Sequence, residues 1–299
     1  MEVIAEIAQQ SHIKKELKRS QRQLFIRRLL TNKQMVSGGL ILIFLTALAF
    51  IGPLLVPYSP YQMEVMDRLK APNAIHWLGT DEFGRDLLTR IVYGAKVTMG
   101  VGFSVAALSS LFGLVIGLYA GYYRTLDHIL MRICDGLMAI PAILLAIALM
   151  AALGPNTQNV VTALTIVFTP LIARVIRSAA IVVREQTYIE AMKAQGASQL
   201  RIIWMHILPN TISPLVIQAT FIFADAIIIE AALSFLGAGV PAPDPSWGNI
   251  LYDGKMVIFN AWWMTVFPGI TIILSVLGLN LLGDGFRDLI DPHTAKGKK

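Results

Sequence analysis

Long uncharged runs, separated by short stretches that carry the charges, are the dominant pattern of this chain. The runs cover residues 34–63, 97–123, 136–173, 202–224 and 256–283. A helix needs about 20 apolar residues to cross a bilayer, and each run is long enough. The run 136–173 is long enough for two helices and is interrupted by a polar turn signal at 154–159. The pattern therefore predicts an all-α membrane protein with six transmembrane helices.

These spans divide the chain into segments. The six expected spans are 36–57, 96–120, 129–152, 160–181, 210–235 and 259–283. A polar tail, 1–35, precedes the first span, and a polar segment, 58–95, separates it from the second. Residues 96–285 then form a domain of five spans that contains a charged loop at 182–209. A second tail, 286–299, ends the chain.

Composition and charge agree with a membrane protein. Of the 299 residues, 55% are hydrophobic and 15% are charged, whereas soluble domains carry about 25% charged residues. The net charge of +6 does not point to nucleic acid, because basic residues gather in the cytoplasmic loops of membrane proteins. With a cytoplasmic N-terminus, 19 of the 25 Lys and Arg residues fall at or near cytoplasmic segments. We therefore expect both termini and the loop 182–209 in the cytoplasm.

The loop 182–209 has the composition of two helices joined by a turn. Residues 185–195 contain neither Gly nor Pro and are rich in good helix formers. Gly196 can adopt a turn conformation that other residues resist, and Ser198 can cap a second helix. An apolar stripe at helical spacing is expected on that second helix, at Leu200, Ile203, Trp204 and Ile207. The sequence predicts a helix–turn–helix that lies along the membrane surface.

The spacing of Glu190-Ala191, Gly196 and Leu208-Pro209 resembles the EAA loop of ABC-importer permeases. In that family the loop docks on a separate ATPase subunit, so the resemblance implies an ATPase-coupling role for these five residues. The chain has no phosphate-binding G-x-x-x-x-G-K-[ST] motif. We therefore expect a transport subunit and not an enzyme. No cofactor is expected on this chain, since ATP and Mg would be used by the partner ATPases.

Two segments expected outside the membrane narrow the resemblance. Residues 76–86 (HWLGTDEFGRD) and 234–249 look like signatures of the C-type permease subunit of the dipeptide, oligopeptide and nickel ABC importer family. The motif residues are Gly79, Asp81, Gly84, Arg85, Asp86 and Trp247. One interpretation is local pairing of the charges in a loop helix. The other is contact with a substrate-binding protein.

The resemblance implies a type I ABC importer permease fold in the bacterial inner membrane. It implies four kinds of contact: a homologous B-type permease as heterodimer partner, two ATPase subunits, an extracytoplasmic substrate-binding protein and membrane lipid. The implied function is to form half of the translocation pathway for di- or oligopeptides. The same class of importer carries nickel, opines or glutathione, and these cargoes stay open. No His/Cys cluster occurs in the spans, so no metal site is expected.

Charged residues also occur inside the expected spans. Asp225 and Glu230 lie in the fifth span, where a charge at mid-bilayer costs about 3 kcal/mol or more. They are candidates for lining the pathway, or for pairing with a neighbouring helix. They also leave open a different class of function, an ion-coupled secondary transporter.

Three further patterns predict contacts between helices or with the membrane interface. Arg174 and Arg177 in the fourth span, like Arg132 and Asp135 in the third, are expected as interhelical pairs or interfacial anchors. Glycines repeat every fourth residue at 113, 117 and 121, a spacing that permits close helix packing. Residues 262–263 are both Trp, as expected for an interfacial aromatic belt at the start of the sixth span.

Overall fold

The computed structural model describes residues 27 and 29–290. The regular structure in them is helical, and the isolated bridge pair is that between Thr80 and Asp86. The α-helices are α2 (Lys33–Phe50), α3 (Gly52–Leu55), α4 (Leu87–Tyr122), α5 (Arg124–Met138), α6 (Ala142–Leu153), α7 (Thr157–Arg184), α8 (Thr187–Ala194), α9 (Gln199–Arg201), α10 (Leu208–Phe235), α11 (Trp247–Met256) and α12 (Trp263–Ile290). Most of the basic tail 1–35, and residues 291–299, lie outside the described residues.

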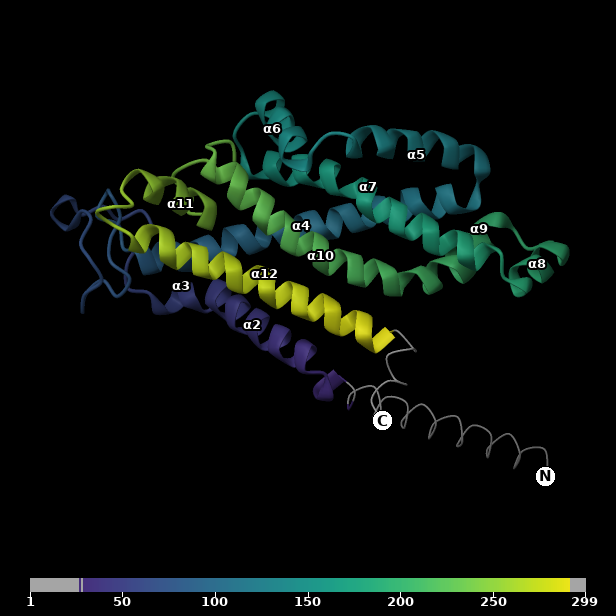
Figure 1. Ribbon diagram of the computed structural model, residues 1–299, viewed down its shortest axis with the longest axis horizontal. Helices are drawn as coiled ribbons and strands as arrows, with labels where there is room; N and C mark the ends of the chain where they lie inside the picture. The colour runs from purple at the N-terminus through teal and green to yellow at the C-terminus, as the bar shows by residue number, and fades with distance from the viewer. Residues whose placement is uncertain (1–26, 28, 291–299) are drawn as a thin grey trace.

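The long helices form a bundle in which α2, α4, α7, α10 and α12 run along the long axis of the molecule (Figure 1). One end of the bundle carries α8 and α9, and the other carries α11 and the segment 56–86. We call these the α8 end and the α11 end. Five helices are long and apolar enough to cross a membrane, and the bent pair α5–α6 makes a sixth if it counts as one span. The all-α fold and its spanning helices are confirmed.

The third expected span, 129–152, is not one continuous helix. It is broken between Met138 and Ala142, and α5 and α6 meet at 92°. Pro141 explains the break, because its ring excludes a helical hydrogen bond and disfavours helical backbone in the residue before it. The sequence predicted one span here, and the structure has two helices instead.

Other helix ends also differ from the expected spans. Helix α4 begins at Leu87, well before residue 96, because Asp86 caps it: its Oδ2 accepts from Thr89 N at 2.8 Å. The polar segment before it is therefore shorter than 58–95. Helix α12 continues to Ile290, past the expected end of its span and into the predicted tail 286–299.

Helices α4 and α7 pack closely along the glycine repeat. A Cβ on Gly113 would lie 2.6 Å from Ile172 Cβ, and one on Gly117 would lie 2.6 Å from the Ala173 carbonyl oxygen. Only a residue without a side chain allows this approach of two backbones. The prediction of close packing is confirmed.

Ion pairs also join α5 to α7. Arg174 Nη2 lies 2.7 Å from Asp135 Oδ1, and Arg177 Nη2 lies 2.6 Å from Asp127 Oδ2. Arg177 makes a second bond to the same carboxylate through Nε, which gives the two-pronged geometry that guanidinium and carboxylate groups favour. The interhelical pairing expected for these two arginines is confirmed.

Candidate functional site

The charged segment between α7 and α10 folds as the helix and turn that its sequence predicts. Helix α8 ends in a turn in which Gly196 has φ +79°. The Ala197 N–H donates to the Met192 carbonyl and the Gly196 N–H to the Lys193 carbonyl, both at 3.0 Å. This is a Schellman cap, whose left-handed residue is usually glycine because a side chain is strained there.

The second half of the segment departs from the expected α-helix. Ser198 caps α9, and its hydroxyl accepts from Arg201 N at 3.4 Å, as predicted. The chain then forms a π-helix over Ile202–Ile207 before α10 begins at Leu208. A π-turn holds more residues than an α-turn and rotates the side chains that follow.

The expected apolar stripe is therefore wrong at two of its four positions. Ile203 and Ile207 are buried, together with Ile202. Leu200 and Trp204 are exposed instead. The prediction assumed a spacing of 3.6 residues per turn, which the π-helix does not keep.

The residues expected to couple to an ATPase lie mostly on the surface of this segment. Ile189 is fully buried and anchors α8 to the bundle. Glu190, Ala191, Gly196 and Pro209 are exposed, and Leu208 is partly buried. Within the part of the chain that the structure describes, no ion pair holds the Glu190 carboxylate. The segment thus offers a short, firmly capped helix with a free carboxylate on its open side.

At the α11 end, buried charges form a network around Asp81. Arg85 Nε lies 2.6 Å from Asp81 Oδ2, and Arg90 Nε lies 3.5 Å from the same oxygen. Both arginines also face Asp253 on α11, at 3.6 Å and 4.0 Å. Burial raises the pKa of Asp253 to about 6, against the lowering effect of Arg90. The predicted pairing of charges in 81–86 is confirmed, but in a turn and not in a loop helix.

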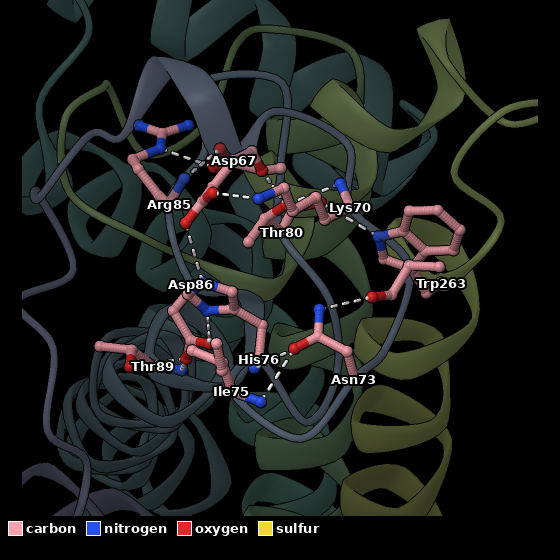
Figure 2. A network of polar contacts seen from close by, with 12 residues as sticks. Asp67, Lys70, Asn73, Ile75, His76, Thr80, Arg85, Asp86, Thr89 and Trp263 are labelled. Carbon is pink, nitrogen blue, oxygen red and sulfur yellow. Dashed lines mark hydrogen bonds and ion pairs between the residues drawn. The ribbon is translucent and has the colours of Figure 1, made fainter.

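A second set of contacts lies beside it and contains His76 (Figure 2). The His76 ring is buried, with Nδ1 2.9 Å from Asp86 Oδ1 and Nε2 3.3 Å from Asp67 Oδ2. Hydrogen bonds from Lys70 and from His76 lower the pKa of Asp67. Asp86 therefore ties the start of α4 to the segment that precedes it.

Two glycines and Trp247 also shape the α11 end. Gly79 has φ +83°, and a Cβ there would lie 2.7 Å from the Lys70 carbonyl oxygen. Gly84 has φ +74°, and its Cβ would collide with the Glu64 carbonyl. Trp247 is buried and its Nε1 donates to the Ile91 carbonyl at 3.0 Å, which joins α11 to α4.

Trp263 does not belong to an aromatic belt, because it is only 5% exposed. Its Nε1 donates to the Thr80 carbonyl at 3.0 Å. Trp262, its neighbour, is 52% exposed and fits the expected interfacial position.

The structure thus favours the structural interpretation of the motif residues Gly79, Asp81, Gly84, Arg85, Asp86 and Trp247, since all six are buried. These residues shape the α11 end and do not face outward. The sequence singled out none of Asp67, His76 and Asp253 as a site residue, although His76 begins the motif 76–86. The fold brings these residues to their partners, and the motif does not show which partners they have.

The two carboxylates expected in the fifth span lie on different sides of α10. Asp225 is exposed on the outside of the bundle. Glu230 is fully buried, and its Oε1 accepts from the Ser234 hydroxyl at 2.8 Å, while its Oε2 has no hydrogen-bond partner among the described residues. The structure does not bring the two together. Nor do three His, Cys, Asp or Glu residues gather as metal ligands anywhere in 29–290.

Comparison with known families shows to which protein family this helical chain belongs. The family model described as "Binding-protein-dependent transport system inner membrane component" matches residues 113–296, and the model "N-terminal TM domain of oligopeptide transport permease C" matches residues 20–72. The chain belongs to this permease family. Membership implies a transport subunit of a membrane-bound system that works with a binding protein and an ATPase.

Several curated relatives align with nearly the whole permease. A putative peptide transport system permease protein of Brucella abortus is 47% identical over 270 residues, 90% of this chain and 91% of the relative. A dipeptide transport system permease protein of Alkalihalophilus pseudofirmus is 47% identical over 87% of this chain and 86% of its own. A glutathione transport system permease protein of Pectobacterium atrosepticum is 40% identical over 90% of both chains.

A solved structure supports the fold of the permease. It is an inward-facing methionine ABC transporter, whose matching chain has a TM-score of 0.57 and 22% sequence identity. The match covers 68% of this chain and 97% of that chain. At this identity the likeness establishes the helical architecture and not the cargo.

Proposed function

We propose that this permease forms half of the translocation pathway of an ATP-driven, binding-protein-dependent importer for di- or oligopeptides. Two relatives named for peptide and dipeptide transport, each 47% identical along most of their length, support this cargo. The 40% identical relative named for glutathione, itself a tripeptide, makes glutathione the second candidate.

Uptake by the complete transporter tests the cargo. Proteoliposomes that contain the permease, its partner subunits and the binding protein are given labelled dipeptide, glutathione or Ni²⁺, each with and without internal ATP. The proposal predicts ATP-dependent dipeptide uptake that exceeds uptake of the other two. Uptake driven by a proton or sodium gradient without ATP would instead support the ion-coupled alternative.

The observation that carries the coupling role is the exposed carboxylate of Glu190 on the capped helix α8. Ile189 packs α8 against the bundle, and α8 follows α7 after a short link. At its other side the Gly196 turn, α9 and the π-helix lead directly into α10. A displacement of α8 by a docked ATPase would therefore pass to two membrane-spanning helices at once.

We also infer the orientation and the remaining partners from this arrangement. The bias of 19 of 25 Lys and Arg residues supports a cytoplasmic α8 end and cytoplasmic termini. Two ATPase subunits would bind there and use ATP and Mg, while the binding protein would dock at the α11 end. We expect one six-span half to be too small to enclose a pathway alone, so a homologous B-type permease would supply the other half. Asp225, exposed on α10, is then the better pathway-lining candidate of the two carboxylates.

A further inference from the structure

A polar pocket lies between the bundle and α8, behind the surface proposed to meet the ATPase. Its volume is about 460 Å³. It is lined by Tyr122, Tyr123, Arg124, Arg184, Lys193, Ala197 and Gln199. Three of these residues are cations and none is an acid, so the pocket is suited to a negatively charged group.

Arg184 forms the fixed wall of the pocket. Its Nη1 donates to the Gly121 carbonyl at 2.9 Å and to the Tyr122 carbonyl at 3.4 Å. Both carbonyls belong to the last turn of α4, where helical carbonyls lack a partner of their own. Its Nη2 lies 2.8 Å from Glu185, which is exposed and does not line the pocket. Arg184 is thus already bonded, and Glu185 offsets its charge.

Lys193 and Arg124 supply the charge that is not neutralised. Lys193 lies one helical turn after the buried Ile189, so it shares the face of α8 that is turned toward the bundle. Its Nζ lies 5.7 Å from the centre of the Tyr122 ring. Neither Lys193 nor Arg124 forms an ion pair within the range 29–290, and both are exposed to solvent at the pocket.

The place of the pocket relative to the bilayer points to the source of the anion. The uncharged run 97–123 of α4 ends at Tyr123, and Arg124 follows it directly. Tyrosines and cations at the end of a spanning helix lie at the level of the lipid headgroups. Arg124 and the two tyrosines of the pocket are therefore expected at the level of the headgroups, within reach of an anionic lipid.

We infer that this pocket binds the phosphate of an anionic phospholipid headgroup, held by Lys193 and Arg124 against the wall that Arg184 forms. Basic pockets between membrane helices bind anionic headgroups in this way. A bound headgroup would bridge α8 to the start of α5 and thereby brace the segment. This inference needs only a membrane-embedded chain and does not rest on the coupling role of α8 or on the cargo.

Lipid retention by the purified full-length protein in its transporter complex tests the inference. The complex is equilibrated with phosphatidylglycerol and phosphatidylcholine in equal amounts, washed, and its retained lipid is measured by mass spectrometry. We expect preferential retention of phosphatidylglycerol, which Lys193→Gln and Arg124→Gln each lower about fivefold, as expected for the loss of one cation near an anionic headgroup. Lys193→Arg keeps the charge and should retain the lipid.

Arg201→Gln is the matched control, because Arg201 is an exposed cation of the same segment that does not line the pocket. It should retain the lipid as the wild type does. Equal retention in all variants, or an equal loss in Arg201→Gln, would overturn the inference. A loss of co-purifying ATPase in the pocket variants, with lipid retention unchanged, would also overturn the inference. The pocket would then bind an acidic side chain of the ATPase.

A competition arm separates the two sources of phosphate. Millimolar inorganic phosphate should leave the retained phosphatidylglycerol in place, because the glycerol backbone and acyl chains add contacts that free phosphate lacks. Displacement of the lipid by inorganic phosphate would assign the pocket to a soluble ligand and overturn the lipid assignment.

Discussion

His76 Nδ1 lies 2.9 Å from Asp86 Oδ1, while Asp86 Oδ2 accepts from Thr89 N at 2.8 Å and caps α4. One buried carboxylate therefore fixes both the start of a spanning helix and the segment that precedes it. The motif 76–86, which resembles an importer signature, thus has a structural role at the start of α4. Its residues hold the α11 end in one shape.

Replacement of this cap should destabilise the permease. Asp86→Ala removes the acceptor of the Thr89 N–H and the partner of His76, and loss of an N-cap alone costs about 1 kcal/mol. We expect a lower midpoint of thermal unfolding in detergent than for Glu64→Ala, a matched loss of an exposed carboxylate in the same region. Equal midpoints for the two variants would contradict this role of Asp86.

The adjacent tryptophans 262 and 263 offer a matched pair. Trp263→Phe removes the donor to the buried Thr80 carbonyl, which should cost about 1–3 kcal/mol. Trp262→Phe removes an indole that is 52% exposed and should leave the unfolding midpoint nearly unchanged. The contact between α12 and the segment 56–86 would be of no energetic importance if the two variants unfolded at the same temperature.

Two glycines of α4 should respond to alanine with opposite signs. Alanine favours a helix by about 1 kcal/mol over glycine, so Gly100→Ala, with nothing within 4 Å of the new Cβ, should raise the unfolding midpoint. At Gly117 the new Cβ would lie 2.6 Å from the Ala173 carbonyl oxygen and force α4 away from α7. Gly117→Ala should therefore lower the unfolding midpoint. A stabilised Gly117→Ala protein would show that the two helices are not in close contact.

Asp253 should make stability depend on pH. Burial raises its folded-state pKa from 3.8 to about 6, so the folded protein binds this proton more tightly than the unfolded chain does. The contribution is fully present below about pH 4 and is lost as the pH rises through about 6. Asp253→Asn has no such loss, so its unfolding midpoint relative to wild type should be higher at pH 7.5 than at pH 4.5. A difference that is constant, or larger at pH 4.5, would contradict the raised pKa.

The spanning helices could be predicted because each depends on a local property, a long uncharged run. The break between α5 and α6 was missed, although Pro141 was visible in the sequence. A proline in a membrane helix is compatible with a mild kink or with a full break, and the choice depends on what the two halves pack against. Here α5 is held to α7 by the ion pairs of Arg174 and Arg177.

The two ends of the candidate site also differ in whether their contacts are local or long-range in the sequence. The Gly196 turn and the Ser198 cap are made by residues a few positions apart, and the sequence predicted both. The contact of Thr80 with Trp263 joins residues 183 positions apart, and no local pattern indicates it. The π-helix at Ile202–Ile207 was missed for another reason, since its sequence differs little from that of an ordinary α-helix.

The most direct test of the account is whether the Glu190 face of α8 holds the ATPase. The measurement is the amount of ATPase and of partner permease that co-purifies with the full-length chain, wild type against Glu190→Lys. Glu64→Lys, the same charge reversal at the α11 end, is the control. We predict that Glu190→Lys loses the ATPase and keeps the partner permease, whereas Glu64→Lys keeps both. Full recovery of the ATPase with Glu190→Lys would contradict the coupling role of α8.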